Sequence, residues 1–174
     1  KTAIAPTASI SIICGGSSPG IEPIAANSFT HKTLSGSFNV RNKYLKKVLH
    51  KYNKDNDEVW SSITTNQGSI SHLDFLTSDE KDTFKTAFEI DQRWIIELGA
   101  DRTPHISQAQ SINVFVPADI HKKELHNIHF QAWKKGLKSL YYCRSKSIQR
   151  AENVEAGSST DVTKNVYSKS NESN

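Results

Sequence analysis

Apolar residues recur at helical spacing in the middle of the chain. Between residues 40 and 52, one set of positions is apolar or aromatic and the positions between them carry lysine or arginine: Val40, Tyr44, Leu45, Val48, Leu49 and Tyr52. Apolar stripes of this kind, three or four residues apart, are typical of an amphipathic helix. The pattern predicts a helix ending near Asn53, and residues 59–63 predict a second, shorter one.

A longer periodic stretch follows a helix-start signal at Thr77. Thr77 and Glu80 have the spacing of a capping box, in which each side chain accepts a hydrogen bond from the other residue's backbone. Helical spacing then continues through six apolar positions: Phe84, Ala87, Phe88, Trp94, Ile95 and Leu98. Gly99 is a residue type that often follows the last turn of a helix. The pattern predicts one long helix between Thr77 and Gly99.

Strand and helix signals alternate farther along the chain. Residues 112–116 are β-branched and aromatic, and a proline, which cannot donate to a strand ladder, ends the run. A helix is predicted to open at Ala118 or Asp119 and to end at Gly136, with residues 137–143 as a second strand. A strand, a crossover helix and a strand make a parallel βαβ unit with a right-handed connection. The sequence therefore predicts an α/β fold.

Both ends of the chain differ from this middle part. Up to about residue 37 the sequence is rich in Ser, Thr, Gly and Pro, which predicts loops around one short strand at residues 10–13. Residues 153–174 contain almost nothing apolar, too little to offset the entropy of ordering them, so a disordered C-terminal tail is expected. Residues 1–152 are expected to form the folded domain.

Composition narrows the classes of protein. A chain of 174 residues and 19.4 kDa has room for one domain, and no apolar run approaches the ~20 residues of a membrane helix. A net charge of +4 is small beside the concentrated basic face of a nucleic-acid binder. Two cysteines, Cys14 and Cys143, cannot form a disulfide scaffold, and with no secretory leader they indicate a cytoplasmic protein. A sequence without methionine suggests a piece of something longer.

Four motifs, taken together and in order, resemble one known family. They are residues 6–9 (PTAS) with 20–23 (GIEP), 66–70 (NQGSI), 108–113 (QAQSIN) and 129–142 (HFQAWKKGLKSLYY). In this order they resemble the C-terminal part of the large (alpha) subunit of ribonucleoside-diphosphate reductase. The resemblance extends over nearly all of the expected folded part. It implies the last third or so of a ten-stranded α/β barrel, which a parallel βαβ unit fits.

The resemblance also implies two functional sites. In the family, the Pro-Thr-Ala-Ser segment opens a helix whose N-terminus meets the substrate diphosphate, so Thr7, Ala8 and Ser9 are expected to contact phosphate. Free N–H groups and the positive end of a helix dipole suit an anion, which favours a helix over the strand predicted from composition. In class I enzymes of the family a Tyr-Tyr pair relays an oxidising equivalent, and this resemblance assigns radical transfer to Tyr141 and Tyr142.

Without the resemblance, both sites have simpler interpretations. A Thr-Ala-Ser tripeptide beside a glycine-rich loop is common in solvated turns. Two neighbouring tyrosines on a strand point to opposite faces, usually with one ring in the core and one half exposed. His121, His126 and His129 have only Glu124 as a nearby further ligand, so no metal site is expected.

The resemblance implies partners and cofactors outside this chain. The family's reducing cysteines lie in an earlier part of the subunit, and neither Cys14 nor Cys143 matches one, so neither is assigned a role. This piece is expected to bind no cofactor directly and to be inactive alone. It would depend on the rest of the large subunit, on the radical metallocofactor of the small (beta) subunit, and on thioredoxin or glutaredoxin as reductant. Large subunits of the family commonly form homodimers.

Two alternatives remain open at this stage. The basic helix from Arg41 to Lys51 would suit a stand-alone, non-enzymatic module that binds nucleic acid or a partner protein. Some cobalamin-dependent relatives carry a similar Tyr-Tyr segment, so the chain could belong to a reductase of that class. The sequence leaves open the nucleotide preference and the regulation. It also leaves open the external reductant, because the tail has no cysteine pair.

Overall fold

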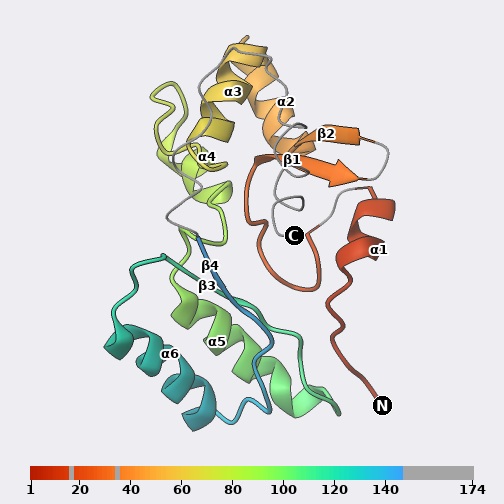
Figure 1. Ribbon diagram of the computed structural model, residues 1–174, viewed down its shortest axis with the longest axis vertical. Helices are drawn as coiled ribbons and strands as arrows, with labels where there is room; N and C mark the ends of the chain where they lie inside the picture. Colours follow the sequence, from red (N-terminus) through yellow and green to blue (C-terminus); the bar gives the residue numbers. More distant parts are fainter. Residues whose placement is uncertain (16–17, 34–35, 147–174) are drawn as a thin grey trace, which may run out of the picture.

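The computed structural model describes residues 1–15, 18–33 and 36–146, and the predicted tail lies outside the described residues (Figure 1). Within them no helix is both long and apolar enough to span a bilayer. The helices and strands run in this order: α1 (Ala8–Ile13), β1 (Ser28–Thr33), β2 (Gly36–Arg41), α2 (Lys43–Lys51), α3 (Asp57–Thr65), α4 (Ser78–Thr83), α5 (Gln92–Arg102), the 3-10 helix η1 (Thr103–His105), β3 (Val114–Val116), α6 (Lys122–Lys134) and β4 (Cys143–Ser145).

The strands of the described part form two small sheets. β1 and β2 pair as an antiparallel hairpin, with Ser28 opposite Arg41. β3 and β4 pair in parallel, with Val114 opposite Cys143, and α6 connects them (Figure 1). This confirms the predicted parallel βαβ unit and the mixture of helix and strand. Neither sheet closes into a barrel within the described residues.

Helix starts follow the capping residues. Asn42 accepts hydrogen bonds from the backbone N–H groups of Tyr44 and Leu45 and so begins α2. Thr77 and Glu80 form the predicted capping box at the start of α4. The two helices predicted before residue 66 are confirmed as α2 and α3, although α2 begins after Arg41 because β2 includes that residue.

The prediction of one long helix after Thr77 is wrong, because residues 84–91 separate α4 from α5. Side chains bind the backbone of this connection and satisfy groups that a helix would have paired internally. Glu89 Oε2 accepts hydrogen bonds of 2.8 Å from both the backbone N–H and the hydroxyl of Thr86. Gln92 Nε2 donates to the carbonyl oxygens of Ala87 and Ile90.

Gly99 lies inside α5 and does not follow it, which corrects the predicted helix end. A Cβ at this position would lie 2.7 Å from Ile112 Cδ1, in the segment that leads into β3. A larger residue here would have to displace the ends of the Ile112 and Leu137 side chains, a demand that helical periodicity does not reveal. The helix ends three residues later, where Thr103 Oγ1 donates to the Gly99 carbonyl oxygen.

Four further predictions are corrected. Residues 10–13 belong to α1, as the resemblance implies, and not to a strand, while the hairpin of β1 and β2 lies largely in a region predicted to be loop. α6 opens at neither Ala118 nor Asp119 but after His121, whose Nδ1 accepts a hydrogen bond from the Lys123 backbone N–H. The strand predicted at residues 137–143 is displaced, since β4 begins only at Cys143.

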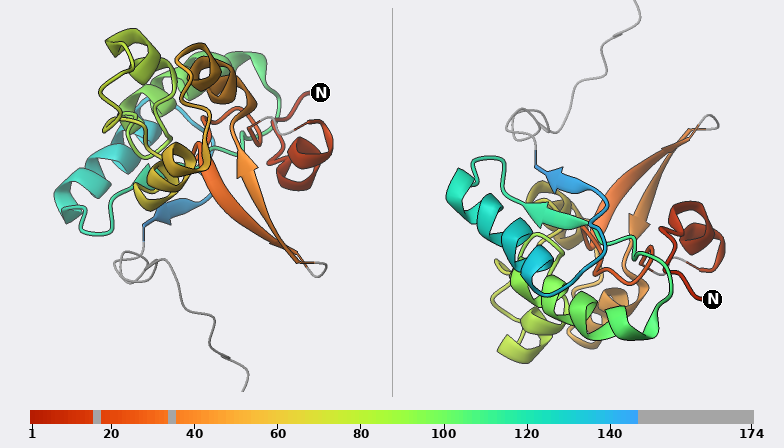
Figure 2. Two further views of the ribbon diagram at one scale, coloured as in Figure 1. Left: turned by 90° about the horizontal axis from the view of Figure 1, so that it is seen from above. Right: turned by 90° about the horizontal axis from the view of Figure 1, so that it is seen from below.

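Two apolar clusters lie on either side of the connection before α5. One joins α2, α3 and the loop that follows α3: Leu45, Leu49, Trp60, Ile63, Ile70, Leu73 and Leu76. The other joins α5, β3 and α6: Ile96, Val114, Val116, Ile128 and Ala132. Figure 2 shows α5 and α6 packed beside the β3 and β4 pair. The second cluster is the core that supports the segment before β4.

A fully buried asparagine holds the first cluster to the hairpin. Asn27 Nδ2 donates to the carbonyl oxygens of Gly68 (3.0 Å) and Phe84 (2.8 Å), and its Oδ1 accepts from Asn42 Nδ2 (2.9 Å). Gly68 has a φ of +82°, and a Cβ there would lie 2.3 Å from the Ala26 Cβ. The glycine of the Asn-Gln-Gly-Ser-Ile motif is therefore required by both backbone conformation and close approach.

We predict that Gly68→Ala destabilises the chain more than Gly136→Ala. Both glycines have a positive φ, so each substitution costs about 1–2 kcal/mol of backbone strain. Only at Gly68 does the added methyl overlap a neighbour, since Gly136 has open space, and this overlap should cost a further ~1–3 kcal/mol. Chemical denaturation of the two variants measures the difference. Equal losses would show that Ala26 moves aside freely.

Candidate functional site

Tyr141 and Tyr142 lie against each other. Their ring centroids are 4.2 Å apart at an interplanar angle of 54°, and the residues are 46% and 54% exposed. Neighbouring side chains on a regular strand would point to opposite faces. Both tyrosines instead precede β4, although the backbone here already contacts the β3 segment, with Tyr141 N donating to the Ile112 oxygen (2.8 Å) and Val114 N to the Tyr142 oxygen (3.0 Å).

The neighbouring phenol shifts the pKa of Tyr141. A hydrogen bond with Tyr142 raises the pKa of Tyr141 above its ordinary value, and the charge that Tyr142 would carry and partial burial act in the same direction. Arg144 opposes this rise in the pKa of Tyr141, and its guanidinium carbon lies 5.4 Å from the Tyr142 ring centroid. The raised pKa keeps Tyr141 protonated at neutral pH, and its ring lies against that of a second tyrosine.

The predicted phosphate segment begins α1. Thr7 has a φ of +51°, an unusual conformation for a β-branched residue, and its hydroxyl does not cap the helix. Thr7 Oγ1 instead accepts a hydrogen bond of 2.6 Å from the Gly20 backbone N–H. This contact joins the Pro-Thr-Ala-Ser segment to the Gly-Ile-Glu-Pro segment and leaves Ala8 and Ser9 exposed at the start of α1.

A buried pair of residues, Glu22 and Asn113, joins the Gly-Ile-Glu-Pro segment to the segment at residues 108–113. Glu22 and Asn113 are 6% and 7% exposed, and both carboxylate oxygens of Glu22 accept hydrogen bonds from Asn113. Both residues lie within the motifs that resemble the family, and the sequence alone assigns neither of them a role. The one available signal is a charged residue flanked by Ile21 and Pro23 in a short apolar stretch.

The structure does not bring the two predicted sites into contact. Figures 1 and 2 show α1 at one side of the molecule, apart from β4. Hydrogen bonds nevertheless connect the segments that contain them, from Thr7 to Gly20, from Glu22 to Asn113, and from Asn113 Oδ1 to the Tyr142 backbone N–H (3.0 Å). Three of the four motifs thus form one connected set of contacts.

The histidines and cysteines of the described residues form no metal site. No group of three or more His, Cys, Asp or Glu residues in the described ranges could hold a metal ion. His129 Nδ1 lies 2.8 Å from the Leu125 carbonyl oxygen, and the His126 ring stacks on Phe130. Cys14 and Cys143 are exposed free thiols.

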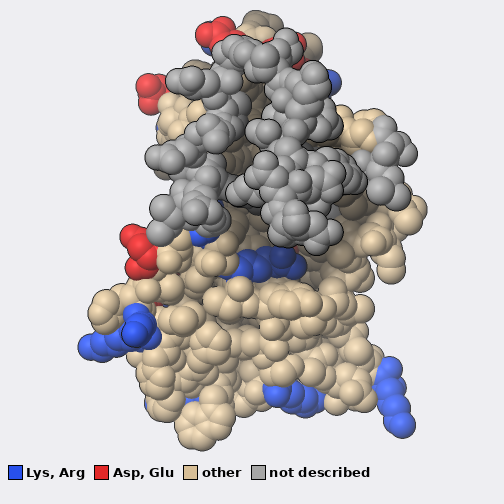
Figure 3. Space-filling view, viewed as in Figure 1, with Lys and Arg blue, Asp and Glu red and all other residues tan. Residues whose placement is uncertain are grey.

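The basic residues near α2 are largely paired. Arg41 binds Asp57 at 2.8 Å, Lys43 Nζ donates to the Gly15 carbonyl oxygen, and Lys51 lies 3.8 Å from Glu80. Among the described atoms visible in Figure 3, Lys and Arg side chains lie in separate places. These contacts give no support to a nucleic-acid surface on α2.

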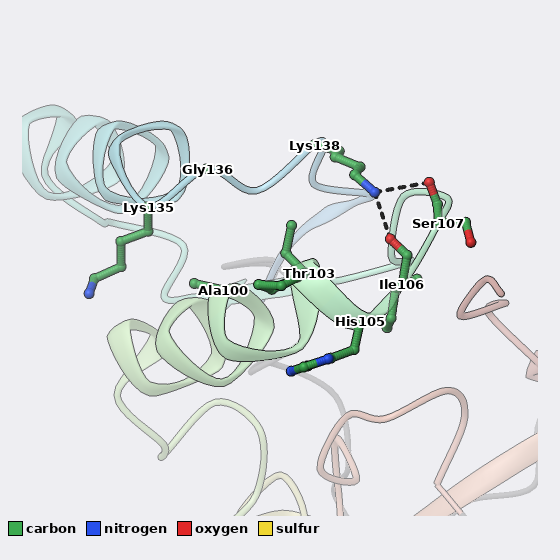
Figure 4. Close-up of a pocket in the computed structure, with 9 residues that line it drawn as sticks. Ala100, Thr103, His105, Ile106, Ser107, Lys135, Gly136 and Lys138 are labelled. Atoms are coloured by element: carbon green, nitrogen blue, oxygen red, sulfur yellow. Dashed lines mark hydrogen bonds between the residues drawn. The ribbon is translucent and has the colours of Figure 1, made fainter. Parts of the chain in front are cut away.

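A cavity of about 570 Å³ lies between the end of α5, η1 and the loop after α6 (Figure 4). It contains none of the predicted site residues. Lys138 Nζ donates to the carbonyl oxygens of Ile106 (2.6 Å) and Ser107 (2.9 Å), and Lys135 pairs with Glu97 at 2.6 Å. Both lysines of the cavity therefore have partners within the fold.

We predict that Tyr142→Phe lowers the pKa of Tyr141. The substitution removes the hydrogen bond that contributes most to the raised pKa and also removes the charge of the neighbouring phenolate. A pH titration of the tyrosine ring resonances by NMR measures this change. Tyr44→Phe is the control, because Tyr44 lies on α2 and should leave the titration of Tyr141 unchanged. A Tyr141 titration unaffected by Tyr142→Phe would contradict the phenol contact.

Comparison with known proteins relates this geometry to a family. A sequence model of the family described as ribonucleotide reductase, barrel domain, matches residues 1–143. The ribonucleoside-diphosphate reductase large subunit of Invertebrate iridescent virus 6 is 51% identical over 158 residues, which cover 88% of this chain and 16% of that protein. The large subunit from Caenorhabditis elegans is 38% identical over 142 residues, or 81% of this chain and 18% of that protein.

A solved structure agrees with these sequence relatives. The Actinobacillus ureae class Id ribonucleotide reductase alpha subunit has a TM-score of 0.73 and 39% identity to this chain, and the similarity covers 82% of this chain and 26% of that one. The chain thus spans between about a sixth and a quarter of the length of these relatives. Because the barrel-domain match extends over most of its length, the chain belongs to the ribonucleotide reductase large-subunit family.

Proposed function

We propose that this chain is the C-terminal part of a class I ribonucleoside-diphosphate reductase large subunit. In this role it contributes the tyrosine step of radical transfer and part of the substrate diphosphate site. The observation that carries the proposal is the contact of Tyr141 and Tyr142, with ring centroids 4.2 Å apart, in a member of this family.

The phenol pair has the chemistry that a radical relay needs. When one tyrosine is present as a phenoxyl radical, it can take an electron and a proton from the neighbouring phenol, which becomes the radical in turn. The ring contact provides the path for the electron, and the phenol interaction that raises the pKa of Tyr141 would carry the proton. Exposure of both rings leaves space for the groups before and after them in the relay.

Family membership also supports a diphosphate site at the start of α1. The first backbone N–H groups of a helix have no acceptor within the helix, and the side chains of Ala8 and Ser9 are small and exposed there. The Thr7 hydroxyl accepts from Gly20 and so keeps its own proton available for a phosphate oxygen. Thr7, Ala8 and Ser9 are therefore the proposed phosphate contacts.

The proposed activity requires other components. The remaining part of the large subunit would supply the reducing cysteines, and the small subunit would supply the radical from its metallocofactor. Thioredoxin or glutaredoxin would return the electrons used in each turnover, and two large subunits would pair. In this proposal, radical generation and substrate reduction depend on cofactors and residues outside this chain. The role of the chain itself is to position the substrate and to relay the radical.

We predict that the chain, combined with the rest of the large subunit, the small subunit and a dithiol, reduces ribonucleoside diphosphates. Tyr141→Phe and Tyr142→Phe should each abolish this turnover, because phenylalanine has no oxidisable phenol. Deoxyribonucleotide formation is the measurement, and Tyr52→Phe is the control for the loss of a phenol elsewhere. Full activity with both relay tyrosines replaced contradicts the proposal. Turnover that needs adenosylcobalamin and no small subunit would assign the chain to the cobalamin-dependent class.

We also predict that Ala8→Glu weakens substrate binding without weakening the fold. An acidic residue in the first turn stabilises a helix, yet it repels a diphosphate bound at the same place. In the assembled enzyme the KM for the ribonucleoside diphosphate should rise about tenfold or more, the equivalent of ~1.4 kcal/mol. Ala8→Gln is the matched control, since it adds a side chain of the same size without charge. Equal KM values for the two variants would show that α1 does not face phosphate.

A further inference from the structure

A buried carboxylate that the proposed function does not use lies between the two functional segments. Glu22 Oε1 accepts from the Asn113 backbone N–H at 2.6 Å, and Glu22 Oε2 accepts from Asn113 Nδ2 at 2.9 Å. Two donors from one residue fix the plane of the carboxylate as well as its place. A carboxylate this deeply buried is costly unless it is hydrogen-bonded, so the pairing with Asn113 is a strong structural requirement.

Asn113 passes this constraint to the tyrosines. Its Oδ1 accepts the backbone N–H of Tyr142 at 3.0 Å, so both ends of the amide have a partner. If the amide were turned over, its NH₂ group would face the Tyr142 N–H and its oxygen would face the Glu22 carboxylate. Glu22 therefore determines which way the Asn113 amide faces, and the amide in turn determines where the Tyr142 N–H points.

This contact accounts for the departure of the tyrosines from a regular strand. The Tyr142 N–H binds a side chain and not a backbone carbonyl, while the flanking groups Tyr141 N and Tyr142 O still pair with the segment around Ile112 and Val114. Where strand pairing is interrupted in this way, two consecutive side chains no longer have to point to opposite faces.

We propose that Glu22 and Asn113 form the positioning element that holds Tyr142 against Tyr141. Neither residue contacts substrate in this scheme, so both are positioning residues. The link from Gly20 to Thr7 connects the same element to the start of α1. The contribution to turnover rests on the proposed function, whereas the contribution to the ring contact rests on the hydrogen bonds alone.

The first test uses the full chain and follows the titration of the Tyr141 ring by NMR. Asn113→Ala should lower the pKa of Tyr141 toward its ordinary value, as is predicted for Tyr142→Phe, because the two phenols separate. Asn27→Ala is the matched control: it also removes a buried, hydrogen-bonded asparagine, but one beside the other cluster, and should leave this pKa unchanged. An unchanged Tyr141 titration in Asn113→Ala overturns the proposal.

A second pair of variants keeps the test decisive if Asn113→Ala fails to fold. Asn113→Asp alone places two carboxylates against each other and should separate the rings. The double variant Glu22→Gln with Asn113→Asp keeps one buried charge and all three hydrogen bonds of the pair. The side chain at position 22 then donates to the carboxylate at position 113, which is the reverse of the native bond. It should restore the ring contact, seen as the ring-current shift of the Tyr141 resonances. A double variant no better than Asn113→Asp overturns the proposal.

Turnover in the assembled reductase tests the functional part. Misplacing a reacting group by about 1 Å can cost about a hundredfold in rate, so Asn113→Ala should lower kcat by that order while the KM for the ribonucleoside diphosphate stays unchanged. The double variant should recover most of kcat. Normal kcat in Asn113→Ala, in an enzyme that Tyr141→Phe inactivates, overturns the positioning role. If Tyr141→Phe is itself active, the proposed function fails, and the titration still decides the ring contact.

Discussion

Buried amide side chains that bind distant backbone groups hold this structure together. The described strands are few and short, so backbone pairing alone cannot join segments that are far apart in sequence. Asn27 joins the hairpin to α2 and to the connection before α5, and Gln92 joins α5 to the backbone N–H of Phe115 in β3. Gln110 binds the Gly99 carbonyl oxygen near the end of α5. Within the described residues, no buried side-chain nitrogen or oxygen lacks a partner.

The same kind of contact reaches the functional segments. Asn113 differs from the other buried amides because its partners are a carboxylate and the backbone of Tyr142. The packed core of α5, β3 and α6 begins next to this residue, which directly precedes β3, and the tyrosines themselves remain half exposed. Such an arrangement combines fixed geometry with access, which fits the radical transfer proposed for the two tyrosines.

Local signals predicted a helix correctly where a capping residue directly precedes a set of apolar residues at helical spacing. α2, α3 and α6 follow their apolar periodicity, and the Thr77 capping box begins α4. The long helix failed after Thr83 because Glu89 and Gln92 bind the backbone of the connection, and periodicity carries no information about such contacts. The hairpin was missed because its strands are polar and mostly exposed, so they lack an apolar alternation.

By itself, the sequence predicted α2, α3 and α6, the parallel pairing of two strands and, through four motifs in order, the family. Only the tertiary structure decided how the motifs act together. It showed that Thr7 binds Gly20, that Glu22 binds Asn113, and that the two tyrosine rings touch. The physical reason is that Glu22 and Asn113 are 91 residues apart, and a hydrogen bond over that separation depends on the packing of every element between them. No local pattern of residues records it.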